Sequence, residues 1–195
     1  CHFSLDIRCL PSEKPKRWIK KYTTFCAKLE KEIKQDQLNG YVPWMIVASA
    51  GTTDTGAVDP LKAIGAIALK HKIWYHIDAA YGGFFLLTSK GKKLLKGIET
   101  SDSIVLDPHK SLFLPYGSGV ILIKNGTQMK KTFSDTAAYF QDFKNNDLNV
   151  SPADLSIELT RPFRGLRMWL PLKIHGLTPF RATLDEKLIL SKYFY

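Results

Sequence analysis

The sequence predicts an α/β fold with a largely parallel sheet, and two features of its hydrophobic pattern support this prediction. Between residues 44 and 123, short apolar runs of strand length alternate with segments of helical periodicity. Glycine- and threonine-rich loops separate these runs. Strands that alternate with helices in this way are typical of βαβ units, which place successive strands parallel to one another.

The individual elements follow from periodicity and from stop signals. A first helix is expected over 15–38, where aromatic and aliphatic residues recur at spacings of three and four before Asn39 and Gly40 end the run. Strands are expected at 44–48, 73–77, 103–106 and 119–123, and helices at 60–70 and 90–97. Further along, the pattern predicts an exposed loop over 141–152 and helical segments over 154–175 and 179–195.

A change in character beyond Lys124 suggests two parts, residues 1–160 and residues 161–195, with a boundary near Thr160. The sequence begins without an initiator methionine and ends inside a helical pattern. We therefore expect the chain to be a fragment, truncated at both ends.

Composition argues against several classes of function. The formal net charge of +10 raises the possibility of nucleic-acid binding, but the basic residues are spread over several predicted helix faces, which favours solvated surfaces over a phosphate-binding patch. No run of about 18 apolar residues is present, so we expect no membrane partner and a cytoplasmic location. Cys1, Cys9 and Cys26 are odd in number and lack metal-ligand spacing, which favours reduced thiols and no metal site.

Polar residues follow three of the predicted strands. Thr52 and Thr53 follow the first strand, Asp78 ends the second, and His109 and Lys110 follow the third. Taken singly, each has an ordinary structural explanation as a turn, cap or surface residue. Because open α/β sheets bind ligands at the carboxyl ends of their strands, however, all of them are candidates for one site.

Together these residues suggest a specific chemistry. A cofactor built on a protonated pyridine ring needs a carboxylate at its ring nitrogen and a lysine amine that condenses with its aldehyde. Asp78, expected to be buried at its strand end, and Lys110 supply these two groups. The small side chain of Ala80 leaves room for a flat ring.

Three segments in this order and spacing resemble the group II pyridoxal-phosphate-dependent amino-acid decarboxylases: 50–53 (AGTT), 76–83 (HIDAAYGG) and 107–110 (DPHK). That family includes aromatic-amino-acid, histidine, glutamate and cysteine-sulfinate decarboxylases. The resemblance extends from about residue 44 to residue 195 and includes the arginine-rich segment 160–169. It implies a type I pyridoxal-phosphate-dependent transferase fold, similar to aspartate aminotransferase. Residues 1–160 would form part of the cofactor-binding large domain, and 161–195 would begin the C-terminal small domain.

The resemblance assigns five residues to pyridoxal 5'-phosphate. Lys110 matches the lysine that carries the cofactor, Asp78 matches the partner of the pyridine nitrogen, and Ala80 matches an alanine that packs on the ring. Thr53 matches a threonine that contacts the cofactor, and His109 matches the histidine close to its phosphate.

Two further residues acquire catalytic roles by resemblance. Tyr139 falls where the family has a loop tyrosine that returns a proton to the substrate Cα, and His2 resembles the histidine that stacks on the ring and meets the substrate. Ser111 departs from the family, many of whose members have a bulky tryptophan there, and the loop 115–119 is unusually rich in glycine. These departures leave the substrate open.

The implied function is decarboxylation of an L-amino acid, with an aromatic one favoured, to an amine and carbon dioxide by a homodimeric enzyme. Three alternatives remain: an aldehyde synthase or aminotransferase on the same fold, a truncated family member that acts only through protein contacts, and a basic nucleic-acid binder. Arg161 and Arg164 either bind phosphate or carboxylate groups or pair with neighbouring acidic residues, and pairing with Asp154 or Glu158 is favoured.

Overall fold

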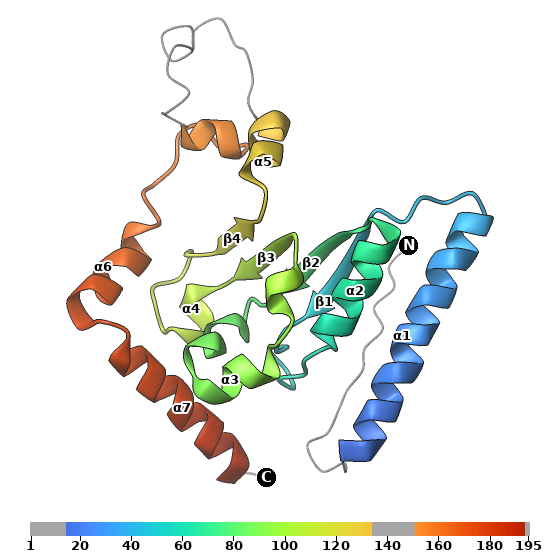
Figure 1. The fold of residues 1–195 in the computed structure, drawn as a ribbon. Coiled ribbons are helices and arrows are strands. Elements are labelled where there is room, and N and C mark those ends of the chain that lie inside the picture. The colour runs from blue at the N-terminus through green and yellow to red at the C-terminus, as the bar shows by residue number, and fades with distance from the viewer. Residues whose placement is uncertain (1–14, 134–150, 194–195) are drawn as a thin grey trace, which may run out of the picture.

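The computed structural model describes residues 15–133 and 151–193, with side chains from residue 23 onward. A four-stranded sheet in the order β1-β2-β3-β4 forms its centre (Figure 1). Strands β1 (Met45–Ser49), β2 (Trp74–Asp78) and β3 (Ser103–Leu106) are parallel, whereas β4 (Val120–Ile123) is antiparallel to β3. The expected, largely parallel arrangement is therefore confirmed, with β4 as the antiparallel exception.

Seven α-helices and three short 3-10 helices accompany the sheet in the described ranges. The α-helices are α1 (Pro15–Leu38), α2 (Leu61–His71), α3 (Ser89–Leu94), α4 (Pro108–Ser111), α5 (Gly126–Phe133), α6 (Leu166–His175) and α7 (Thr178–Tyr193). The 3-10 helices are Gly83–Leu87, Ile98–Thr100 and Pro152–Leu155. None of the helices in the described part of the chain is both long and apolar enough to cross a membrane.

Most predicted elements lie within a few residues of their expected positions, and α1 has the predicted bounds. The helical prediction over 154–175 is wrong in its middle, because residues 156–165 are not helical. Pro162 explains the break, since proline lacks a backbone donor and disfavours helical geometry in the residue before it. The short helices α4 and α5 were not anticipated, and most of the predicted loop at 141–152 lies outside the described residues.

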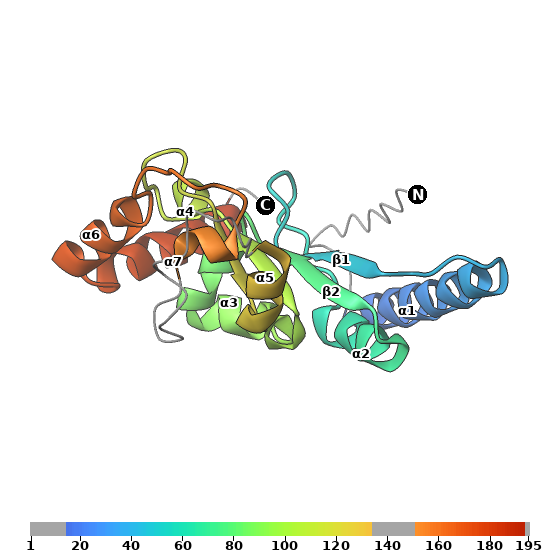
Figure 2. The same cartoon turned by 90° about the horizontal axis from the view of Figure 1, so that it is seen from above.

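One face of the sheet packs against α2, and α1 lies outside α2 (Figures 1 and 2). The main core joins alternate strand residues to the inner face of α2: Ala48, Tyr75 and Ile77 with Leu61, Ile64 and Ala68. A smaller cluster of Ile33, Ile67 and Ile73 attaches α1. Tyr75 and Ile77 of β2 are buried against α2. Because successive side chains of a strand point to opposite faces, the side chain of Asp78 lies on the opposite face of the sheet.

That opposite face is open within the described residues. Val47 of β1 is 59% exposed and Ile121 of β4 is 55% exposed. The strand register places Val47 beside His76, and both Asp78 and Ile121 beside Val105, so all five side chains share this face. We call it the open face of the sheet.

Helix α7 supports the segment that follows β3. Leu184 is fully buried against Leu112 and Leu114, which come directly after α4. The Arg181 side chain also donates a hydrogen bond from Nε to the Leu87 carbonyl, at 2.9 Å. A helix about seventy residues further along the chain thus helps to fix the position of α4.

Glycines allow the loops after β1 and β2 to touch. A Cβ atom on Gly82 would lie 2.1 Å from the Ala50 carbonyl oxygen and 2.7 Å from the Gly51 Cα, and both of these are backbone atoms. Gly51 itself has a φ of +88°, a conformation that side chains rarely adopt. Only glycine at position 82 therefore permits the two loops to approach this closely.

We expect Gly82→Ala to destabilise the protein by about 1–3 kcal/mol, because the added methyl group must push two backbone segments apart. The matched control is Gly126→Ala, since a Cβ there meets no atom within 4 Å. Urea unfolding of both variants tests the contact. Equal midpoints for the two variants would show that the loops separate without cost.

Candidate functional site

The carboxyl ends of β1, β2 and β3 lie at one edge of the sheet because these strands are parallel (Figure 1). Thr53 lies in the loop after β1, Asp78 is the last residue of β2, and Lys110 lies in α4, just after β3. The predicted site residues that the structure describes therefore belong to this edge, which we call the carboxyl edge. His2 and Tyr139 lie outside the described residues.

Asp78 is exposed, so the expectation of a buried carboxylate is wrong for this chain. The physical reason is its place on the open face of the sheet, which helices in the described residues do not cover. One carboxylate oxygen, Oδ1, accepts a hydrogen bond from the backbone N–H of Ala80 at 3.0 Å. This bond fixes the side chain over the start of the next loop and leaves the other oxygen available to a ligand.

The neighbouring loops supply a threonine and a small residue. The Thr52 hydroxyl is already hydrogen-bonded inside its own loop. It lies 3.0 Å from the Thr55 hydroxyl and accepts a hydrogen bond from the Ala57 N–H at 3.1 Å. Thr53, by contrast, has an exposed side chain, as a ligand-contacting residue requires. Ala80 is half-buried, and its carbonyl accepts from the Asp107 N–H at 3.1 Å.

Lys110 forms an ion pair with Asp107. The Lys110 Nζ atom lies 2.8 Å from Asp107 Oδ2, and the two side chains are 35% and 16% exposed. Asp107 occupies the position before the first turn of α4, yet its side chain makes no capping hydrogen bond. Sequence reasoning missed this residue, although its spacing of three from Lys110 within a helical turn was a usable signal.

His109 lies between the same carboxylate and an aromatic ring. Its Nε2 atom is 4.0 Å from Asp107 Oδ2, and its ring meets Tyr116 edge-on with centroids 4.9 Å apart. Its Nδ1 atom is buried without a hydrogen-bond partner, as is the hydroxyl of Ser111. Buried polar atoms are rarely left unpaired, so these two indicate a group that completes the site.

A second unanticipated arrangement lies on the open face, two residues before Asp78. Trp74 Nε1 donates to the Ser103 hydroxyl at 2.8 Å, and the same hydroxyl lies 2.8 Å from His76 Nδ1. The indole can only donate, so the serine oxygen accepts from Trp74, while its bond to His76 runs in the direction that the histidine tautomer sets. Burial lowers the pKa of His76, and the charge of Asp78 acts in the opposite direction.

The arginines of segment 160–169 have mainly structural partners. Arg164 forms an ion pair with Glu158, at 3.0 Å between Nη1 and Oε2, as the sequence favoured. Arg161 contacts the Ser156 hydroxyl, not Asp154. Arg167 donates to the Tyr116 carbonyl at 2.7 Å and so holds the loop beside His109.

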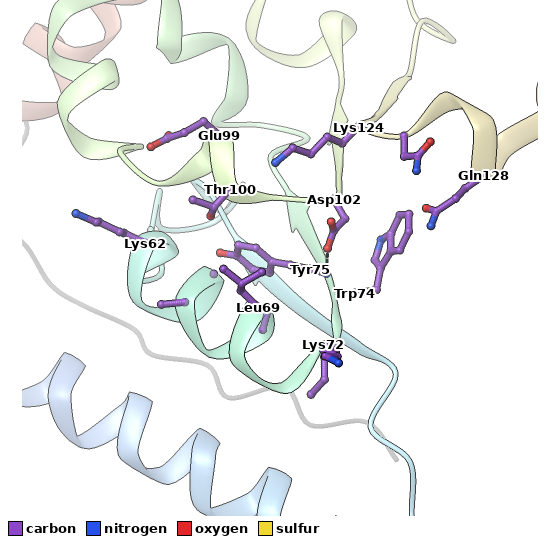
Figure 3. A pocket seen from close by; sticks show the side chains of 15 residues that line it. Lys62, Leu69, Lys72, Trp74, Tyr75, Glu99, Thr100, Asp102, Lys124 and Gln128 are labelled. Atoms are coloured by element: carbon purple, nitrogen blue, oxygen red, sulfur yellow. Dashed lines mark hydrogen bonds between the residues drawn. The ribbon is translucent and has the colours of Figure 1, made fainter.

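A cavity of about 700 Å³ lies at the opposite, amino-terminal edge of β2 and β3 (Figure 3). Leu69, Trp74, Tyr75 and the basic residues Lys62 and Lys124 line it. Its polar atoms are partly committed to the fold, since an Asp102 carboxylate oxygen accepts from the Tyr75 N–H at 2.8 Å. No residue assigned to the carboxyl edge lines this cavity.

No group of three or more metal-ligating side chains occurs in the described ranges. Cys26 is a free thiol, and burial raises its pKa. Cys1 and Cys9 lie outside the described residues.

The sequence is similar to those of known amino-acid decarboxylases. The chain is 39% identical over 165 residues to an aromatic-L-amino-acid decarboxylase of Bacillus atrophaeus, covering 84% of the chain and 34% of that protein. It is 35% identical over 167 residues to the human acidic amino acid decarboxylase GADL1, covering 85% of the chain and 32% of the relative. The chain thus spans about a third of the length of these curated relatives.

Solved structures of similar proteins share the fold. Mouse CSAD in its apo form superimposes with a TM-score of 0.78 at 31% identity, covering 86% of this chain and 35% of that one. Tryptophan decarboxylase of Catharanthus roseus, solved with L-tryptophan, superimposes with a TM-score of 0.76 at 30% identity, covering 87% of this chain and 34% of that one. The α/β core is therefore part of a type I fold.

The family model of the pyridoxal-dependent decarboxylase conserved domain matches residues 6–195, nearly the whole sequence. The same chain presents an aspartate, a lysine and a histidine at the carboxyl edge of its parallel strands. This chain belongs to the pyridoxal-dependent decarboxylase family.

Proposed function

We propose that the full-length protein decarboxylates an L-amino acid, with an aromatic one favoured, to the amine and carbon dioxide with pyridoxal 5'-phosphate as cofactor. The observation that supports this most is the arrangement of Asp78 and Lys110 at one sheet edge in a chain of this family. An acidic group for the ring nitrogen and an amine for the aldehyde are the two groups that this cofactor requires.

The residues of the carboxyl edge fit the cofactor. The Asp78 carboxylate is exposed and fixed by one backbone hydrogen bond. The buried, unpaired Nδ1 atom of His109 lies one residue before Lys110 and indicates a missing polar partner. When bound, pyridoxal phosphate supplies a ring that accepts the electrons left behind by the departing carboxylate.

Each side chain then has a task of its own. Lys110 would hold the cofactor covalently through Nζ, and Asp78 would keep a proton on the ring nitrogen by a charged hydrogen bond. Thr53 and Ala80 would bound the ring, and His109 would contact the phosphate. Tyr139 would deliver the proton that replaces the carboxylate at Cα, and His2 would meet the substrate.

The choice of substrate rests on relatives of both kinds. The 39% identical relative is named for aromatic amino acids, and the 35% identical one is named for acidic amino acids. Incubation of the full-length protein with aromatic and acidic L-amino acids, followed by amine analysis, distinguishes them. We expect an aromatic amine, and exclusive turnover of an acidic substrate would overturn the preference.

An aldehyde synthase is the second candidate, because a 4-hydroxyphenylacetaldehyde synthase of Rhodiola rosea superimposes on this chain with a TM-score of 0.67 at 28% identity. In family members that form aldehydes, the resemblance implies phenylalanine where this chain has Tyr139. The tyrosine favours the amine as product.

We predict that Tyr139→Phe in the full-length protein still releases carbon dioxide but no longer gives the amine as its main product. Without its proton donor the reacting carbon persists longer and is diverted to oxygen, giving aldehyde, ammonia and hydrogen peroxide. Mass spectrometry and a peroxide assay measure the two products. Tyr41→Phe, at an exposed position outside the site, is the control, and an unchanged amine yield from Tyr139→Phe would remove Tyr139 from this role.

We further propose that the enzyme is a cytoplasmic homodimer and that residues 1–160 and 161–195 belong to its large and C-terminal domains. Sedimentation of the full-length protein tests the dimer. A monomer with full activity would contradict it.

A further inference from the structure

We infer that Asp107 is a positioning residue that holds the Lys110 ammonium group whenever the lysine is not bound to the cofactor. The inference rests on the proposed function and deepens it. Its basis is the contact of 2.8 Å between Lys110 Nζ and Asp107 Oδ2 at the carboxyl edge.

The position of Asp107 in the chain would ordinarily give it another task. An aspartate just before a helix normally accepts a hydrogen bond from a backbone N–H of the first turn. Asp107 makes no such bond, although α4 begins at the next residue. Its carboxylate points to Lys110 instead, so stabilising the helix end does not account for its orientation.

The carboxylate is also held in place from several sides. The backbone N–H of Asp107 donates to the Ala80 carbonyl at 3.1 Å, which ties it to the loop after β2. Gly119 lies beside the carboxylate, since a Cβ atom there would be in ordinary van der Waals contact with Asp107 Oδ1, at 3.4 Å. His109 Nε2 lies 4.0 Å from the same oxygen that Lys110 contacts. Asp107 is only 16% exposed and is therefore a fixed partner for a lysine that must move.

The contact between Asp107 and Lys110 should affect the rate at which the cofactor is captured. The Lys110 nitrogen forms a C=N bond with the aldehyde carbon, the aldehyde oxygen leaves as water, and the excess ammonium proton passes to solvent. The Lys110 nitrogen must leave the Asp107 carboxylate before it can attack the aldehyde. Asp107 should therefore slow capture, because the ion pair has to break first.

The same contact should assist substrate exchange. When a substrate amine replaces the lysine on the cofactor, an ammonium group enters with the substrate and an ammonium group is left on Lys110. The Asp107 carboxylate lies where it can receive this group and keep it away from the substrate.

The test measures how fast pyridoxal phosphate is captured by the full-length protein after the cofactor has been stripped. Samples are quenched with borohydride at timed intervals, and the labelled Lys110 peptide is quantified by mass spectrometry at low and at high salt. For Asp107→Asn we expect capture about threefold faster than wild type at low salt, the ratio that a partly exposed ion pair supports. The two rates should converge at high salt, which screens such a pair.

Two variants complete the design. Asp107→Glu retains the charge and should restore the wild-type rate and its salt dependence, whereas Asp36→Asn removes a carboxylate from α1, far along the chain from the site, and should match wild type. A thermal melt of each variant identifies loss of folding. If Asp107→Asn folds and captures the cofactor at the wild-type rate, the inference is wrong. It is also wrong if the Glu variant behaves like the Asn variant.

The outcome for the wild-type protein separates this inference from the proposed function. A wild-type protein that captures no cofactor at low or high salt contradicts the proposed function itself. A wild-type protein that captures it normally, with no effect of Asp107→Asn, contradicts only the role of Asp107.

Discussion

Lys110→Ala is expected to lower turnover of the full-length protein on the order of a thousandfold or more, as removal of a covalent catalytic group does in other enzymes. The variant should also lose the visible absorption that a lysine-bound cofactor gives. Both effects follow from one cause, since the chain then lacks the amine in α4 that we propose binds the aldehyde. Steady-state kinetics and an absorption spectrum measure them.

Lys124→Ala is the matched control for this experiment. Lys124 lines the cavity at the amino-terminal edge of the sheet, so its loss should leave the spectrum and turnover unchanged (Figure 3). Retained visible absorption in Lys110→Ala would show that another lysine binds the cofactor.

Asp78→Asn is the second substitution with a large expected effect. The amide has the same shape and can still accept from the Ala80 N–H, so the loop should remain in place. A neutral amide cannot hold the ring nitrogen protonated, and we expect turnover to fall on the order of a hundredfold or more. Covalent capture of the cofactor should persist, because Lys110 is untouched.

Comparison of the two variants separates the role of Lys110 in cofactor capture from the role of Asp78 in turnover. Lys110→Ala should abolish both capture and turnover, whereas Asp78→Asn should lose mainly turnover. Asp54→Asn, in the exposed loop after β1, is the control for loss of one negative charge near the site. Near-normal turnover of Asp78→Asn would exclude an ionic role for Asp78.

The order of strands and helices was predictable from the sequence because burial on one face imposes a regular pattern. The alternation around Tyr75 and Ile77 in β2 and the helical spacing in α1 both report contacts with the core. The antiparallel β4 was not predictable from its own residues, since an apolar strand has the same pattern in either direction. Its direction is seen only in its pairing with β3.

The candidate site was likewise predictable only in part. Asp78 and Lys110 were found because they follow strands, and the parallel sheet brings strand ends together. The exposure of Asp78 was not predicted, because a local pattern does not reveal which sheet face is covered. The contact between Asp107 and Lys110 depends on the side-chain orientation at the start of α4, where helix capping was the simpler expectation.

The most direct test of the proposed site is to identify the residue that binds the cofactor in the wild-type full-length protein. The purified protein is incubated with pyridoxal phosphate, reduced with borohydride, digested and sequenced by mass spectrometry. We predict one modified peptide, which carries the label on Lys110. A label on any other lysine, or none at all under conditions where the protein is folded, would contradict it.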